Sequence, residues 1–96
     1  MRLRYAPRAR TDIVEIYEYI AQHSPRAAVA VSAQIRATSR LLAEYPDLGR
    51  ETDIPNVRMF PTARYPYLIY YRVRGADLVI VHVRHARRDA PEGIEE

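Results

Sequence analysis

Residues 65–89, YPYLIYYRVRGADLVIVHVRHARRD, contain the segments that decide the fold. Two runs, YLIYYRV and DLVIVHVRH, are rich in the β-branched and aromatic residues that favour strands. They flank the sequence RGA (74–76), whose glycine tolerates the dihedral angles of a tight turn. This stretch therefore predicts an antiparallel β-hairpin, and its second strand ends in His82, His85 and several arginines.

The residues before this hairpin predict one strand and two helices. MRLRYAP at the N-terminus alternates apolar and basic residues, as a short strand does. Pro7 suits the first turn of a helix, and Ser24-Pro25 is a start signal for a second helix, with serine as the N-cap. Because only QHS separates the two helical patterns, they must form an antiparallel hairpin.

The connection between the helices and the final hairpin predicts one more strand. We expect a loop over RETDIPN (50–56) and a strand over VRMFPT (57–62). The element order is then β-α-α-β-β-β. It implies an α+β fold in which a helical hairpin packs on one face of a small, mostly antiparallel sheet. We expect one domain over residues 1–90 and a flexible acidic tail over 91–96.

The composition narrows the class of protein. Hydrophobic residues at 48% with 28% charged residues are typical of a globular domain. Without cysteine, disulfides and thiolate metal sites are excluded. We find no apolar signal segment and no long apolar run, so the sequence predicts a cytoplasmic protein with no membrane contact.

The positive charge is carried entirely by arginine. All fifteen cationic side chains are arginine, and the net charge is +3. Guanidinium groups bind phosphate and carboxylate in a bidentate way, so a basic face would suit nucleic acid or an acidic protein. A GC-rich genome would produce the same arginine bias.

The end of the last strand carries the side chains that are candidates for a chemically active site. His82 and His85 are three residues apart on a strand and point to opposite faces, so we predict no metal site, and nothing in the sequence indicates a cofactor. Alternation places His82 on the same side as Leu78 and Ile80 and partly buried. Two hypotheses stay open for the rest of this end: an acid/base and phosphate site, or a solvated strand end. Its residues are Arg84, His85, Arg87 and Arg88.

Two other groups of side chains have simpler explanations. Asp12, Glu15 and Glu18 have helical spacing and are expected on the solvent face of the first helix. The tyrosines that crowd residues 65–71 suit packing in a half-buried strand, and base stacking is the alternative.

Several motifs together resemble a known family. They are YAPRARTDIVEIYEYIA on the first helix, YPDLGRETD after the second, VRMFPTARYPYLIYYRV, and the closing LVIVHVRHARRD. Over about residues 3–90 the chain resembles the ParE branch of the RelE/ParE superfamily. These proteins are the toxin halves of type II toxin–antitoxin modules, also called plasmid stabilisation proteins.

The resemblance implies a partner. Toxins of this family are neutralised by a cognate antitoxin, ParD-like or related, which forms a hetero-oligomer with the toxin. Its helix would insert apolar anchors into a groove between the helical hairpin and the sheet. The residues expected to contact it are Ile13, Tyr17, Ile20, Leu42 and Tyr70.

The resemblance also implies two competing activities. ParE-like members poison DNA gyrase and cleave nothing themselves, whereas RelE-like members are ribosome-dependent mRNA endoribonucleases. Some ribonuclease members resemble this chain but carry an arginine where Tyr67 stands and a closing His/Tyr pair, and this chain has His85-Ala86-Arg87 there. We therefore expect a gyrase inhibitor, with a ribonuclease as the alternative. A third hypothesis is an inactivated toxin kept as an antitoxin-binding partner.

Each hypothesis gives the same basic residues different roles. For a gyrase inhibitor, the residues expected to contact the target are Arg58, His85, Arg87 and Arg88. For a ribonuclease, His85 would be the acid/base and arginines would hold the phosphate. The candidate catalytic residues are then His85, Arg58, Arg84 and Arg87.

Overall fold

The computed structural model describes residues 1–87, and residues 88–96, which include the whole predicted tail, lie outside the described part. The elements in chain order are β1 (Arg2–Tyr5), α1 (Pro7–Ala21), α2 (Pro25–Glu44), β2 (Arg50–Glu51), β3 (Arg58–Pro61), β4 (Tyr67–Arg74) and β5 (Asp77–His85). The predicted order is confirmed, with one addition. The segment predicted as a loop contains the short strand β2, which pairs with β3. Two residues are too few to produce a periodic pattern.

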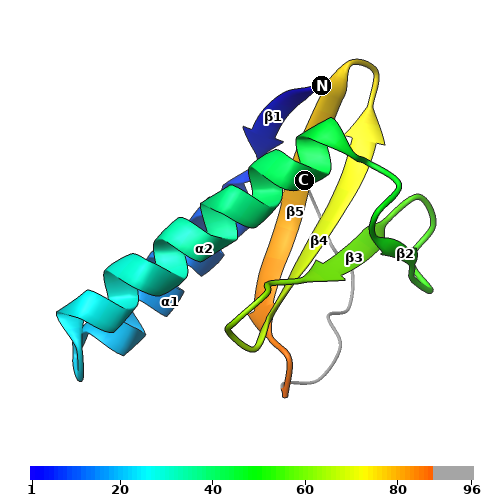
Figure 1. The fold of residues 1–96 in the computed structure, drawn as a ribbon. Helices are drawn as coiled ribbons and strands as arrows, with labels where there is room; N and C mark the ends of the chain where they lie inside the picture. The colour runs from blue at the N-terminus through cyan, green and yellow to red at the C-terminus, as the bar shows by residue number, and fades with distance from the viewer. Residues whose placement is uncertain (88–96) are drawn as a thin grey trace.

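The sheet has the strand order β1-β5-β4-β3-β2. β1 runs parallel to β5, and the other neighbours are antiparallel. Figure 1 shows the two helices packed side by side against one side of this sheet, with β3 and β2 extending beyond them. The α+β architecture expected from the sequence is therefore confirmed.

Both helix starts follow the sequence signals. Pro7 is the first residue of α1, where a missing N–H costs no intrahelical hydrogen bond. Ser24 caps α2, since its side chain accepts a hydrogen bond from the Ala27 N–H at 3.1 Å. Among residues 1–87, no helix combines the length and apolar character that a membrane span requires.

Apolar side chains are buried on both faces of the sheet. The helix-side cluster joins α2 to the sheet and includes Ile35, Leu42, Ile69, Tyr71 and Ile80. The far-side cluster lies on the opposite face and includes Val57, Met59, Tyr70, Val79 and Val81. Residues that alternate along one strand separate cleanly between these two clusters, which is what a strand with two covered faces requires.

A β-bulge in β5 changes which way its histidine points. Tyr71 pairs with Ile80 but Tyr70 pairs with His82, so Val81 is an extra residue in β5. His82 is therefore on the side of Tyr70 and not on the side of Ile80. The predicted side for His82 was wrong, because simple alternation does not survive a bulge. The histidine is also more deeply buried than predicted, with 6% exposed.

Candidate functional site

His85 closes β5 and contacts two neighbours. It pairs with Tyr67 of β4, and the two rings meet edge to face with their centroids 5.5 Å apart. Its Nδ1 accepts a hydrogen bond from the Arg87 N–H at 3.1 Å. A neutral imidazole that accepts at Nδ1 carries its proton on Nε2. In that tautomer Nδ1 is used as an acceptor and Nε2 is a donor.

The neighbouring arginines do not converge on His85. Arg84 lies on the other side of β5, where its Nε donates to the Tyr70 hydroxyl at 2.9 Å and its guanidinium lies 5.6 Å from the centre of that ring. Its terminal nitrogen also donates to the His85 carbonyl oxygen at 3.2 Å. Arg87 is exposed next to His85. Arg88 falls outside the described residues.

Arg58 lies at a different place in the sheet. It pairs with Tyr71 of β4, whereas His85 pairs with Tyr67. Four residues along a strand span about 13 Å, and two strand spacings add about 10 Å across. Arg58 also donates to the Gly49 carbonyl oxygen at 2.7 Å. Arg58 therefore does not share the end of β5 with His85, although both were expected to contact the target.

Tyr71 and Arg58 together fix the loop after α2. The Tyr71 hydroxyl donates to the Pro46 carbonyl oxygen at 2.6 Å and accepts from the Gly49 N–H at 2.8 Å. Burial raises the pKa of this hydroxyl, although the Gly49 hydrogen bond and the Arg58 charge oppose that rise. A Cβ on Gly49 would lie 2.4 Å from the Tyr71 hydroxyl oxygen. The glycine of YPDLG is therefore required by this close approach.

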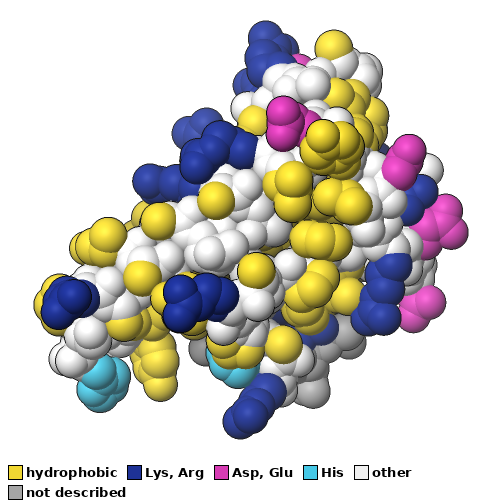
Figure 2. Space-filling model, in the orientation of Figure 1, with side chains coloured by type: hydrophobic (Ala, Val, Ile, Leu, Met, Phe, Trp, Pro, Cys, Tyr) yellow, Lys and Arg dark blue, Asp and Glu magenta, His cyan; other side chains and the backbone are white. Residues whose placement is uncertain are grey.

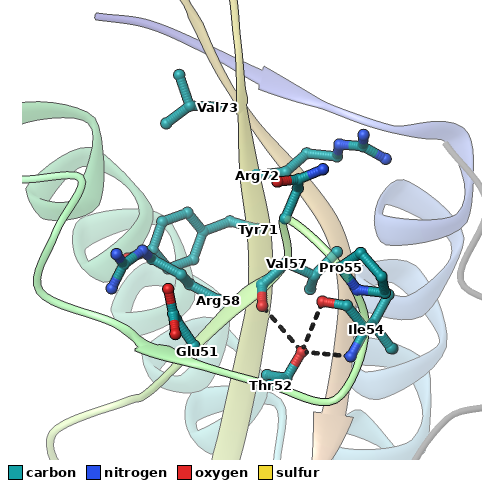
Figure 3. A pocket seen from close by; sticks show the side chains of 10 residues that line it. Glu51, Thr52, Ile54, Pro55, Val57, Arg58, Tyr71, Arg72 and Val73 are labelled. Carbon is teal, nitrogen blue, oxygen red and sulfur yellow. Dashed lines mark hydrogen bonds between the residues drawn. The ribbon is translucent and has the colours of Figure 1, made fainter.

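A cleft of about 520 Å³ lies beside this loop, between β4 and residues 52–57. Figure 3 shows Tyr71 and Arg58 on one side of β4 and Arg72 on the other. The cleft wall is held by Thr52, whose hydroxyl donates to the Val57 carbonyl oxygen at 2.8 Å and accepts from the Ile54 N–H at 3.1 Å. These hydrogen bonds lie within the loop and stabilise the wall of the cleft.

A second cleft, of about 690 Å³, separates α1 from the end of β5. β1 stops pairing with β5 at Ile80, and α1 crosses the edge beyond that point. Asp12 closes this edge. Its Oδ2 accepts from the Val83 N–H at 3.0 Å and lies 2.6 Å from Nδ1 of His82. Asp12 was expected in solvent and instead reaches the sheet, which helical spacing alone does not reveal.

Metal ligands are not grouped. Within residues 1–87, no three His, Asp or Glu side chains come close enough to hold an ion. His82 and His85 pair with Tyr70 and Tyr67, and so they lie on opposite faces of β5, as their spacing predicted.

The residues expected to contact an antitoxin differ in how exposed their side chains are. Leu42 is fully buried, and Ile13 and Tyr70 are nearly so, because they form the two clusters of the sheet. Only Tyr17 is exposed, and Ile20 is half-buried. Ile13, Leu42 and Tyr70 therefore offer little surface to a partner in this structure.

An apolar surface lies next to the buried positions. Figure 2 shows apolar side chains gathered between α2 and the strands β3 and β4. Leu41 and Tyr45 at the end of α2 are exposed at 39% and 59%, and Leu48 in the following loop is exposed at 46%. Phe60 of β3 is half-buried against the helix-side cluster. We call Leu41, Tyr45, Leu48 and Phe60 the α2–β3 groove. Tyr45 follows directly after the last residue of α2, Glu44.

These features define a small two-layer protein with an apolar groove on one side and a basic strand end on the other. Comparisons with known proteins agree with that class. The model of a family described as the ParE toxin of the type II toxin–antitoxin system, parDE, matches residues 3–90. The chain belongs to this family.

Individual relatives support the assignment. The chain is 38% identical over 91 residues to a putative toxin, Y4kP, of Sinorhizobium fredii, covering 95% of this chain and 94% of that protein. It is 36% identical over 83 residues to Toxin RelE2 of Caulobacter vibrioides, covering 84% and 90%. Its fold resembles a chain of the chromosomal ParDE system from P. aeruginosa with a TM-score of 0.80, at 24% identity, covering 91% and 97%.

Proposed function

We propose that this toxin inhibits DNA gyrase, and that a cognate antitoxin neutralises it by direct binding. On this proposal the protein is a binding partner of gyrase and not an enzyme. His85 and Arg87 contact the target at the end of β5, and Arg88 follows them in the chain.

One observation carries the choice of gyrase over RNA cleavage. Cleavage by a ribose 2′-hydroxyl needs a base, an acid and cations that converge on one phosphate. Of the cations that would serve His85, Arg87 is exposed next to it, but Arg58 donates to Gly49 and Arg84 donates to Tyr70 on the opposite face. The orientation of the His85 ring also leaves Nε2 as a donor. This arrangement suits a surface that binds a protein better than it suits a site that transfers protons.

The α2–β3 groove is the proposed docking surface for the antitoxin. Its exposed leucine and tyrosine side chains offer an apolar surface to the apolar face of an amphipathic helix. Burying such anchors gains about 25 cal/mol for each Å² of apolar surface removed from water. An acidic partner would also associate faster with a chain whose cations are all arginine.

A DNA-cleavage assay tests the proposal. Purified gyrase, supercoiled plasmid and ATP are incubated with this protein, with and without the antitoxin encoded by the neighbouring gene. We expect linear DNA to accumulate with the toxin and not when the antitoxin is added. His85→Ala combined with Arg87→Ala should abolish the linear product, whereas Arg26→Gln, at the start of α2, should not.

The second candidate is a ribosome-dependent endoribonuclease. The observation that favours it is the name Toxin RelE2 on a relative at 36% identity. If the gyrase assay yields no linear DNA from a folded and toxic protein, the gyrase proposal fails. Cleavage of mRNA on translating ribosomes that is lost in His85→Ala would then establish the second function.

A further inference from the structure

The end of β5 has a strand edge that α1 covers only in part. β1 pairs with β5 as far as Ile80, and Asp12 of α1 accepts from the Val83 N–H beyond that point. Figure 1 shows α1 diverging from β5 in this direction, and the cleft of about 690 Å³ lies between them. The edge of β5 after Val83 therefore borders the cleft, and within residues 1–87 it has no neighbouring strand on this side.

The hydrogen bonds of β5 show which backbone groups face the cleft. The Ala86 N–H donates to the Pro66 carbonyl oxygen at 2.7 Å and so faces β4, whereas the Val83 N–H faces Asp12. The N–H and C=O of one residue point to the same side of a strand, and that side reverses at each residue. The Val83 carbonyl and the His85 N–H therefore both face the cleft. Neither forms a hydrogen bond within the described part of the chain.

One acceptor and one donor, two residues apart on an edge, are the groups that an added strand binds. Residues that face the same edge are about 7 Å apart in every extended chain, so the spacing matches the backbone of another strand. A helix uses its own N–H and C=O groups internally and offers neither to an edge. The edge therefore selects an extended polypeptide as its partner.

The α1 wall of the cleft is acidic beyond Asp12. Glu15 and Glu18 line the cleft, and neither forms an ion pair within residues 1–87. Arg8 lies before Asp12 on this wall, and no arginine occurs between residue 11 and the end of α1. Tyr19 lies on the same wall and is 63% exposed, so its ring is open to a cation. Two carboxylates beside an aromatic ring suit an arginine or lysine side chain.

We propose that the target contributes an extended segment that adds to β5 as a further strand, with a basic side chain of that segment placed against Glu15 and Glu18. The inference rests on the proposed function, because it takes the end of β5 as the target contact, and it adds the conformation and charge of the segment that is bound. Like charges would repel an acidic antitoxin from this cleft. The antitoxin's proposed docking surface, the α2–β3 groove, lies elsewhere.

An NMR titration of the isolated protein with two hexapeptides tests the binding mode. The first peptide alternates arginine and valine, and the second has the same sequence with every backbone nitrogen methylated. We expect saturable shifts of the Val83 and His85 amide signals with the first peptide only. Hydrogen exchange of the His85 amide should slow by about tenfold or more, because this group gains an acceptor. The Ile69 amide, inside the sheet, is the reference.

Two variants of His85 isolate the backbone donor. His85→Pro and His85→Ala both remove the imidazole ring, and only proline removes the N–H. Proline is compatible with this position, because that N–H faces away from β4. His85→Pro should therefore bind the first peptide about threefold to tenfold more weakly than His85→Ala. Equal affinities of the two variants would overturn the proposal.

A second pair of variants tests the acidic wall. Glu15→Gln with Glu18→Gln should weaken binding of the arginine peptide by about threefold or more. The matched control is Glu44→Gln with Asp53→Asn, which removes the same charge from exposed positions elsewhere. In the gyrase assay, the toxin concentration that gives half of the maximal linear DNA should rise by a similar factor for the first pair and not for the control.

The outcomes distinguish this inference from the proposed function. No linear DNA from the wild type would overturn gyrase inhibition, whereas linear DNA that is unchanged in the Glu15 and Glu18 variant would overturn only the inference. Equal binding of the methylated peptide would also overturn it, since binding would then follow charge alone. A dimer in light scattering that the peptide dissociates would assign the edge to a second copy instead, and binding only after removal of residues 88–96 would assign it to the end of this chain. Circular dichroism of each variant confirms that the protein is folded.

Discussion

At the scale of single residues, Tyr71 joins the loop after α2 to the sheet. Its hydroxyl makes two hydrogen bonds to the backbone of that loop, and its side chain is fully buried. Buried polar groups that lose their partner cost more than the hydrogen bond contributed. This one hydroxyl therefore controls the position of residues 46–49 and, through them, one wall of the α2–β3 groove.

Tyr71→Phe tests that role. It removes the partner of the Gly49 N–H and should lower the free energy of unfolding by about 1–3 kcal/mol, measured by urea titration. Because burial raises the pKa of Tyr71 above its ordinary value of about 10, the hydroxyl stabilises the fold fully below that pH. The stabilisation is lost as pH rises through the raised pKa. Stability of the wild type should thus fall more steeply than that of Tyr71→Phe above about pH 10.

Gly49→Ala tests the close approach to the Tyr71 ring. The added methyl group would overlap the ring, so we expect a loss of about 1–3 kcal/mol. The costs of Gly49→Ala and Tyr71→Phe should not add, because both changes act on one contact. Gly75→Ala is the control. Its methyl group meets nothing within 4 Å and its cost, from a φ of +59°, should add to that of Tyr71→Phe. Additive costs for the Gly49 pair would contradict the proposed contact.

At the scale of elements, β1 ends before β5 does, and α1 covers the edge of β5 that β1 leaves without a partner strand. β1 pairs with β5 only as far as Ile80, so the edge of β5 beyond it needs another partner. Asp12 of α1 supplies that partner by accepting from the Val83 N–H and contacting His82. One helix side chain thus replaces the missing part of a strand.

Asp12→Ala should expose this edge. The Val83 N–H and the His82 ring would lose their partner, and we expect a loss of about 1–3 kcal/mol in unfolding free energy. Hydrogen exchange followed by NMR should show faster exchange of the Val83 amide, with little change in the Ile69 amide of β4. Glu15→Ala, an exposed position on the same helix, is the control. Unchanged exchange at Val83 would mean that Asp12 does not close the edge.

The same elements explain which features the sequence could predict. The helix starts at Pro7 and Ser24 and the hairpin of β4 and β5 depend on local signals, so they were predicted correctly. The face of the sheet on which His82 lies was predicted wrongly, because the bulge at Val81 cannot be recognised from the pattern of residues. The role of Asp12 depends on where another strand ends, and that is a property of the tertiary structure alone. Local patterns therefore predicted the elements but not the contacts between them.

The candidate site shows the same limit. Arg58, Arg84 and Arg87 were grouped with His85 by charge, and only register and strand faces reveal that Arg58 and Arg84 point elsewhere. The antitoxin residues were chosen by hydrophobicity, which selects core positions such as Leu42 before exposed ones such as Leu41.

At the scale of the whole molecule, the two proposed protein contacts occupy different surfaces. The α2–β3 groove is built on α2 and β3, and the proposed target-binding end is built on the end of β5. If both assignments are correct, toxicity and neutralisation are separable by mutation. A protein in which one surface served both roles would lose them together.

Leu41→Asp should weaken neutralisation by the antitoxin and leave toxicity unchanged. A charge on the groove would weaken antitoxin binding by at least about tenfold, measured by calorimetry, because an apolar anchor of an interface is lost. Gyrase-dependent DNA cleavage should remain, and the antitoxin should no longer suppress it at equal concentration. His85→Ala with Arg87→Ala should do the reverse and keep full antitoxin affinity. Val29→Asp, equally apolar and more exposed on another side of α2, should change neither. Loss of both activities in Leu41→Asp, in a protein that remains folded, would show that antitoxin and target compete for one surface.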